Sequence, residues 1–155
     1  RGPESRTENI RFEHNTCVGA GRGWGHTQRP DPNGRHLMFY VNSARTMGVR
    51  VVGNIFYDAT DSGLRMENDW TSGLTMDRNC WWQEAGTLML YLRTPFTVDR
   101  FADFQRQTHL GVHSIVADPG FVSLEARDFR LLPSSPARTV TDDGRPAGSG
   151  KRLVD

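Results

Sequence analysis

The sequence lacks long hydrophobic runs and has few cysteines. Its longest unbroken apolar runs, 37–41 and 88–92, are far short of the roughly 18 residues that a membrane-spanning helix needs, so we expect no membrane segment. The two cysteines, Cys17 and Cys80, belong to no C-x-x-C or Cys/His cluster, which argues against a disulfide framework and against zinc. No charged segment followed by an apolar stretch opens the chain, so we identify no signal peptide in it.

The sequence also lacks an excess of positive or negative charge. Lys and Arg total 19 and Asp and Glu total 18, so the net charge is +1, without the basic excess of a nucleic-acid-binding protein. We therefore expect no nucleic-acid partner. Lys151 is the single lysine, and the other basic residues are arginines. Arginine suits bidentate recognition of carboxylates, although biased codon usage explains the same composition.

Aromatic residues are well represented, and they indicate a folded core. The chain has four Trp, eight Phe and three Tyr in 155 residues, a length that suits one domain. The informative feature is an internal repeat. Three segments align without gaps: 9–17, 48–56 and 73–81.

Each aligned segment carries an alternating apolar pair, two spacers and an asparagine. The asparagines are Asn15, Asn54 and Asn79, spaced 39 and 25 residues apart. A Gly/Pro-rich insertion within 19–34 explains the longer spacing, so both periods fall near 25. Such a period predicts stacked coils of short strands, with the asparagine amides bonded along the stack.

A second strand belongs to each repeat. These strands are expected at 37–41, 64–67 and 88–92. Alternation predicts one inward-facing set: Leu37, Phe39, Val41, Leu64, Met66, Leu88, Leu90 and Leu92. The outward-facing set is then Met38, Tyr40, Arg65, Glu67, Met89 and Tyr91. A short helix is expected over 97–107, with Phe101 and Phe104 packed on the end of the stack.

The repeat, together with the segments 113–121, 128–131 and 133–137, resembles the C-terminal coils of the right-handed parallel β-helix, or pectate-lyase-like, superfamily. The resemblance implies an all-β fold: a short right-handed parallel β-helix of about three to four coils with a small C-terminal helical or irregular cap. It places this unit at 1–137 and an irregular tail at 138–155. Many bacterial relatives are polysaccharide lyases or glycoside hydrolases, so the resemblance also favours a secreted or periplasmic location.

An outward sheet face with aromatic and guanidinium groups suits an acidic polysaccharide. We expect binding residues at Tyr40, Arg65, Tyr91, Arg93 and Trp24. Whether the chain also cleaves a polysaccharide stays open. The catalytic candidates are Glu67 and Asp69, a carboxylate pair two residues apart on one strand, and His36 as a base.

No cofactor is expected. Asp58, Asp61 and Asp69 could approach a calcium site, but no ligand loop is recognisable. The N-terminal end of the stack has no apolar plug, so we expect a homo-oligomer, with Ile10 and Phe12 at the contact, or missing upstream coils. The alternative functions are a non-catalytic structural or assembly protein and a small independent protein of another role.

Overall fold

The computed structural model describes residues 6–23, 27–28, 32–40 and 46–150. Fifteen strands and a few short helical segments make up this part of the chain. The strands of the repeat region are β1 (Thr7–Glu8), β2 (Arg11–Glu13), β3 (Thr16–Ala20), β4 (Arg35–Phe39), β5 (Thr46–Met47), β6 (Val49–Val52), β7 (Ile55–Ala59), β8 (Ser62–Met66), β9 (Leu74–Asp77), β10 (Cys80–Trp82) and β11 (Thr87–Tyr91). They are followed by β12 (Thr94–Phe96), η1 (Val98–Arg100), α2 (Phe101–Thr108), β13 (Ile115–Val116), β14 (Phe121–Ser123), β15 (Asp128–Leu131) and η2 (Pro136–Arg138).

Strands at the same position of successive repeats pair in parallel. Phe12 of β2 lies opposite Val51 of β6, which lies opposite Met76 of β9. The same offsets of 39 and 25 residues pair β3 with β7 and β7 with β10, while β8 pairs with β4 and β11. The predicted repeat is therefore confirmed as the rule that determines strand pairing.

The asparagine stack is confirmed as well. The backbone N–H of Asn15 donates to Asn54 Oδ1 at 2.9 Å, and that of Asn54 donates to Asn79 Oδ1 at the same distance. The side-chain amides of Asn15 and Asn54 donate to the same two oxygens at 3.1 and 3.0 Å. Asn54 and Asn79 are fully buried, so these bonds satisfy groups that water cannot reach.

The pectate-lyase-like assignment is wrong. It requires a closed β-helix, whereas the described strands form five separate sheets: β1-β5, β2-β6-β9, β3-β7-β10-β13, β4-β8-β11-β12 and β14-β15. No closed solenoid is delineated by these sheets. The repeat spacing specifies which strands pair, but it does not specify how the turns between sheets join. The fold is largely β, with several small, mostly parallel sheets and one α-helix.

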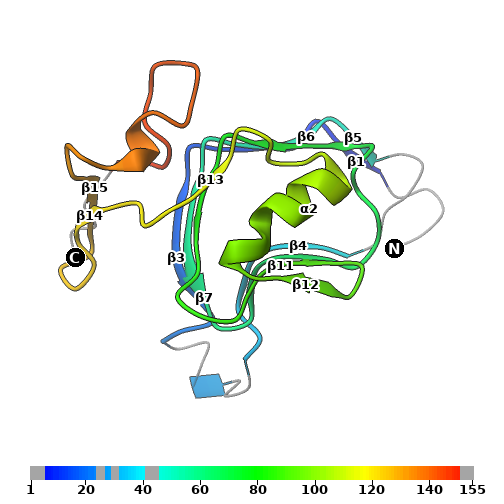
Figure 1. The fold of residues 1–155 in the computed structure, drawn as a ribbon, viewed down its shortest axis with the longest axis horizontal. Coiled ribbons are helices and arrows are strands. Elements are labelled where there is room, and N and C mark those ends of the chain that lie inside the picture. The colour runs from blue at the N-terminus through cyan, green and yellow to red at the C-terminus, as the bar shows by residue number, and fades with distance from the viewer. Residues whose placement is uncertain (1–5, 24–26, 29–31, 41–45, 151–155) are drawn as a thin grey trace.

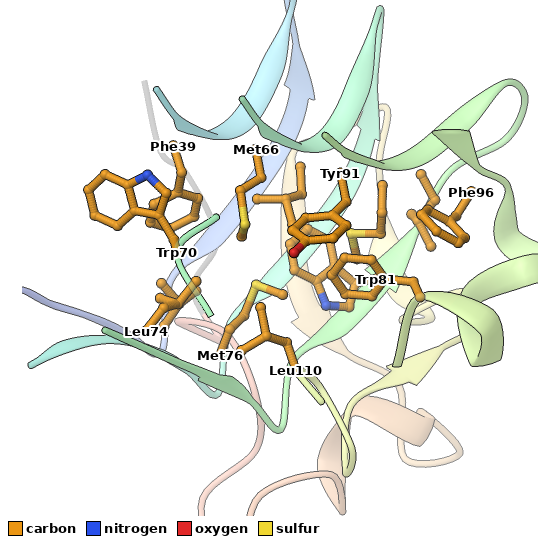
Figure 2. Close-up of a cluster of buried hydrophobic side chains, with 14 of the residues drawn as sticks. Phe39, Met66, Trp70, Leu74, Met76, Trp81, Tyr91, Phe96 and Leu110 are labelled. Atoms are coloured by element: carbon orange, nitrogen blue, oxygen red, sulfur yellow. The ribbon is translucent and has the colours of Figure 1, made fainter. Parts of the chain in front are cut away.

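The larger of two apolar clusters in the described part of the chain is formed by side chains of the three sheets of the repeat region, which surround a common space in Figure 1. Phe56 of β7 stacks on Trp81 of β10 with ring centroids 4.2 Å apart, and both side chains are fully buried. Figure 2 shows the other side of this core, where Phe39, Met66 and Tyr91 point inward from β4, β8 and β11. Phe39 packs against Trp70 at 5.1 Å.

The helix predicted at 97–107 is present as η1 followed by α2. Phe101 and Phe104 of α2 are buried as expected, and Phe104 contacts Phe96 and Tyr91 at the last strands of the repeats. In Figure 1 this helix lies across the space that the three sheets surround. No helix among the described residues is both long and apolar enough to cross a membrane.

The segment after the repeats covers the outer face of β3, β7 and β10 (Figure 1). Phe121 of the β14–β15 hairpin packs on Tyr57 at 5.8 Å. Val140 and Ala147 are buried, and the backbone of Gly148 donates to the carbonyl of Gly53 at 2.7 Å. The irregular tail predicted from 138 therefore packs as part of the fold as far as it is described.

The two cysteines are free and lie on opposite faces of the same sheet. Cys17 of β3 packs against the core between the sheets, and Cys80 of β10 packs under the C-terminal segment. Burial raises the pKa of both thiols, that of Cys80 to about 12, so both are held protonated.

Candidate functional site

The outer face of β4, β8 and β11 carries a row of solvent-accessible side chains, which we call the outer strip. Its members are Met38, Tyr40, Arg65, Glu67, Leu90 and Leu92. Arg65 lies opposite Met38 on one neighbouring strand and opposite Leu90 on the other. Met38, Tyr40 and Leu92 are 47%, 46% and 43% exposed. Met38 and Tyr40 therefore point outward, as the alternation predicted.

A chain of ion pairs holds the charged members of the strip in place. Arg35 Nε lies 2.6 Å from Asp61 Oδ2, and Arg65 lies 3.8 Å from the same oxygen. Arg65 also pairs with Glu67 through its Nε. Each of these side chains is a quarter to a third exposed, so the chain of charges is partly shielded from water. The guanidinium of Arg65 is thus fixed in the plane of the strip.

Tyr91 does not lie on this face, so its predicted outward position is wrong. The side chain is 6% exposed and points into the core (Figure 2). Leu88 and Met89 are both fully buried, so two consecutive residues face the interior at the start of β11 and the alternation shifts by one. Met89 then lies opposite Leu64, and Leu90 and Leu92 take the outward positions predicted for Met89 and Tyr91.

The hydroxyl of Tyr91 is tied to the turn after β8. Burial raises its pKa, and a hydrogen bond to Asp69 adds to the shift. Asp69 accepts from the backbone N–H of Thr71 at 2.9 Å and from its hydroxyl at 2.7 Å. These bonds hold the pKa of Asp69 below its usual range, which makes this carboxylate a turn-forming group.

Two further predicted binding residues stand apart from this row. Arg93 follows β11 in a left-handed conformation, with φ of 72°, and is exposed. Within the described part of the chain it makes no ion pair. Trp24 lies outside the described residues.

The predicted catalytic arrangement is not assembled. Strand β8 ends at Met66, so Glu67 and Asp69 do not share the extended strand on which their predicted spacing rests. Glu67 pairs with Arg65, while Asp69 belongs to the turn described above. His36 is half-buried, with its ring 5.7 Å from that of Phe56. Burial lowers the pKa of His36, so it stays neutral, but it faces the core rather than the strip.

The sequence reasoning missed a polar cavity at the corner that precedes β8. Arg22, Asp58 and Glu84 line two neighbouring hollows of about 350 Å³ each. Asp58 is buried and accepts from Arg22 Nε at 3.1 Å, while Tyr57 donates its hydroxyl to Glu84 at 3.2 Å. Burial and the neighbouring Glu84 raise the pKa of Tyr57 to about 12, so the phenol remains a donor.

One sequence signal could have pointed to this corner. Tyr57 and Trp82 occupy paired positions in the repeat, and a carboxylate follows each within two residues. The three predicted calcium ligands do not gather there, because Asp58 pairs with Arg22, Asp61 with Arg35, and Asp69 bonds Thr71. The described residues contain no group of three or more His, Cys, Asp or Glu side chains that could hold a metal ion.

Comparison with known proteins gives one informative match. The chain is similar to YwoF, an uncharacterised protein of Bacillus subtilis, with 35% identity over 86 residues. The match covers 54% of this chain and 18% of that protein, so the chain spans less than a fifth of this relative's length. No family model and no solved structure matches, so the pectate-lyase-like assignment has no support from this side either.

Proposed function

We propose that this protein binds an acidic polysaccharide along the outer strip. The observation that carries the proposal is a row of three exposed side chains beside the guanidinium of Arg65: Tyr40, Met38 and Leu92. The carboxylates of Asp61 and Glu67 hold this guanidinium in place. An exposed tyrosine ring is a platform for the apolar face of a pyranose. Fixed charged groups accept and donate hydrogen bonds to sugar hydroxyls with little loss of side-chain entropy, because they are already ordered.

Two arginines supply the preference for acidic sugars. Arg65 presents a planar guanidinium within the strip, and Arg93 adds an exposed one beside the end of β11. A guanidinium binds a carboxylate through two parallel hydrogen bonds, which suits a uronate unit. Because Glu67 and Asp61 already neutralise part of the charge of Arg65, we assign the larger electrostatic contribution to Arg93.

The corner cavity extends the proposed binding surface. It lies at the turns that lead into β8 and β11, the strands that carry the strip. Its carboxylates Asp58 and Glu84, together with the phenol of Tyr57, offer both acceptors and a donor for sugar hydroxyls. We propose that one sugar unit of a bound chain enters this corner.

The finer fold is also a proposal. We propose that the three parallel sheets are the walls of a short right-handed parallel β-helix of about three to four coils. The constant register between repeats and the asparagine stack support this arrangement. In stacked coils, the side chains of the outer strip would follow one another across neighbouring strands, which lie about 4.8 Å apart.

We propose binding without assigning cleavage, because no catalytic pair is assembled on the strip. An assembly protein without affinity for sugars is the alternative. The experiment that separates them is an array of alginate, polygalacturonate and glycosaminoglycan fragments, with methyl-esterified pectin as the uncharged match to polygalacturonate. We expect retention of an acidic chain and weaker retention of the esterified chain. The appearance of new reducing or unsaturated ends would identify an enzyme.

Single substitutions locate the site on the molecule. We expect Tyr40→Ala and Arg93→Gln to weaken binding of the retained chain. Arg65→Gln should cost about 1.5–3 kcal/mol, the value of a hydrogen bond to a charged group. Arg106→Gln is the matched control, because Arg106 is an exposed arginine on α2, outside the strip. Equal affinity in all four variants, or no retention of any glycan, would refute the proposal.

A further inference from the structure

The strands of the first repeat are all edge strands. β2 ends the sheet β2-β6-β9, β3 ends the sheet β3-β7-β10-β13, and β4 ends the sheet β4-β8-β11-β12. All three therefore leave one row of backbone N–H and C=O groups without a strand partner in the described part of the chain. An edge of this kind is a template for a further strand, and here three edges belong to one layer of the fold.

The asparagine stack is open at this end only. Asn15 donates to Asn54, Asn54 donates to Asn79, and the backbone N–H of Asn79 donates to Ser114 Oγ at 3.0 Å, which closes the far end. The Oδ1 of Asn15 accepts no hydrogen bond from any described residue. The stack therefore has a direction, and among the described residues its first acceptor takes no donor.

A second set of bonds runs in the opposite direction, from each asparagine to the repeat before it. The side-chain amide of Asn54 also donates back to the carbonyl of Phe12 in the preceding repeat at 2.8 Å, and that of Asn79 donates back to Val51 at 2.9 Å. Asn15 has no preceding repeat among the described residues. Its amide donates to the carbonyl of Glu13, as that of Asn54 donates to Val52, but within this part of the chain it makes no bond equivalent to the one from Asn54 to Phe12. Asn15 thus has both the acceptor and the donor that one more layer would use.

The opposite end of the repeats is partly covered, although β9, β12 and β13 are the last strands of their sheets. β12 pairs with β11, β13 pairs with β10, and the backbone of Gly111 donates to Met76 of β9 at 2.7 Å. At that end the N–H of Asn79 is already bonded to Ser114 Oγ and its amide to Val51, so a second copy offers no equivalent asparagine donor to the open end. In two copies related by a twofold axis, the open ends would face each other and the two asparagine stacks would run in opposite directions. Each copy would present Asn15 Oδ1 as an acceptor, so neither would supply the asparagine N–H that continues the stack.

We propose that the edges of β2, β3 and β4 bind a further parallel layer, supplied by a polypeptide segment that carries the same repeat pattern. This pattern is an apolar residue, any residue, an apolar residue, two spacers and an asparagine. The incoming asparagine donates its backbone N–H and its amide to Oδ1 of Asn15. The apolar pair covers Phe12, which is only partly buried, and Ile10, which is 49% exposed.

The test adds such a layer to the intact chain. A second copy of residues 49–73 is fused ahead of residue 1, so that residues 1–6 act as the linker before β1 and the rest of the chain is unchanged. We expect backbone amides of β2, β3 and β4 to exchange with solvent about tenfold more slowly than in the unextended chain. The denaturant m-value should rise by roughly one sixth, because 25 residues join the cooperative unit.

The control is the same extension with Asn54→Ala and Val51→Asp in the copied segment only. This control has nearly the same composition, but its copied segment can neither continue the asparagine stack nor pack its strand against Phe12. We therefore expect no protection of the β2, β3 and β4 amides from exchange. Equal exchange and m-values with and without the extension would overturn the proposal. Self-association of the unextended chain that protects the same edges would also overturn it, in favour of a second copy as the occupant.

Discussion

Asn54 should be one of the most sensitive positions in the protein. In Asn54→Ala the N–H of Asn15 loses its acceptor, the carbonyl of Phe12 loses its donor, and Asn79 Oδ1 loses one of its two donors. A buried polar group left without a partner costs about 1–3 kcal/mol. Asn15 is half-buried, while Asn79 keeps its bond from the Asn54 backbone. We therefore expect a loss of about 3–5 kcal/mol.

The assay is urea unfolding followed by circular dichroism, with m-values compared to confirm that the same structure unfolds. Asn68→Ala is the matched control, because Asn68 is exposed and its amide bonds only the carbonyl of its neighbour Glu67 at 3.1 Å. Its substitution should change stability by less than about 0.5 kcal/mol. A loss in Asn54→Ala no larger than in Asn68→Ala would show that the stack does not stabilise the fold.

Three further predictions concern titration and reactivity. Burial lowers the folded-state pKa of His36, so its stabilising effect is present above the unfolded pKa of about 6.5 and is lost as the pH falls. The free energy of unfolding should therefore drop between about pH 7.5 and 5.5. Urea titrations at each pH should show a smaller drop in His36→Gln. Cys17 and Cys80 should resist alkylation in the native state near pH 8 and react only after unfolding, as mass spectrometry would record. Hydrogen bonds from Arg145 hold the pKa of Asp143 below its usual range, so Asp143 stays charged in mild acid. Protection of the Gly148 amide from exchange should therefore persist in mild acid, and Asp143→Asn should reduce it at every pH, as hydrogen-exchange measurements would show.

The sequence contains enough information to predict the strand pairing. The recurring asparagine defines the register of the repeats, and a one-residue error would have placed Asn54 away from Asn79. The helix after the repeats was predictable for a similar reason, because Phe101 and Phe104 lie three residues apart and share one face.

The candidate site was less predictable, for two physical reasons. Tyr91 was assigned to the wrong face because Leu88 and Met89 are consecutive buried residues, and simple alternation cannot reveal such a shift. The corner cavity brings together Asp58 of β7 with Arg22 and Glu84 from two separate loops, which only the folded chain places side by side. The polar C-terminal segment gave no local signal of the contacts that bury Val140 and Ala147.

The central claim is that a polysaccharide binds the outer strip, and oxidative footprinting tests it most directly. Met38 on the strip and Met47 on β5 are matched probes, because they are 47% and 54% exposed. With a retained acidic glycan present, hydroxyl radicals should oxidise Met38 and Tyr40 several-fold less, while Met47 is unchanged. Unaltered oxidation of Met38 and Tyr40 at saturating glycan, or protection of Met47 instead, would contradict the account.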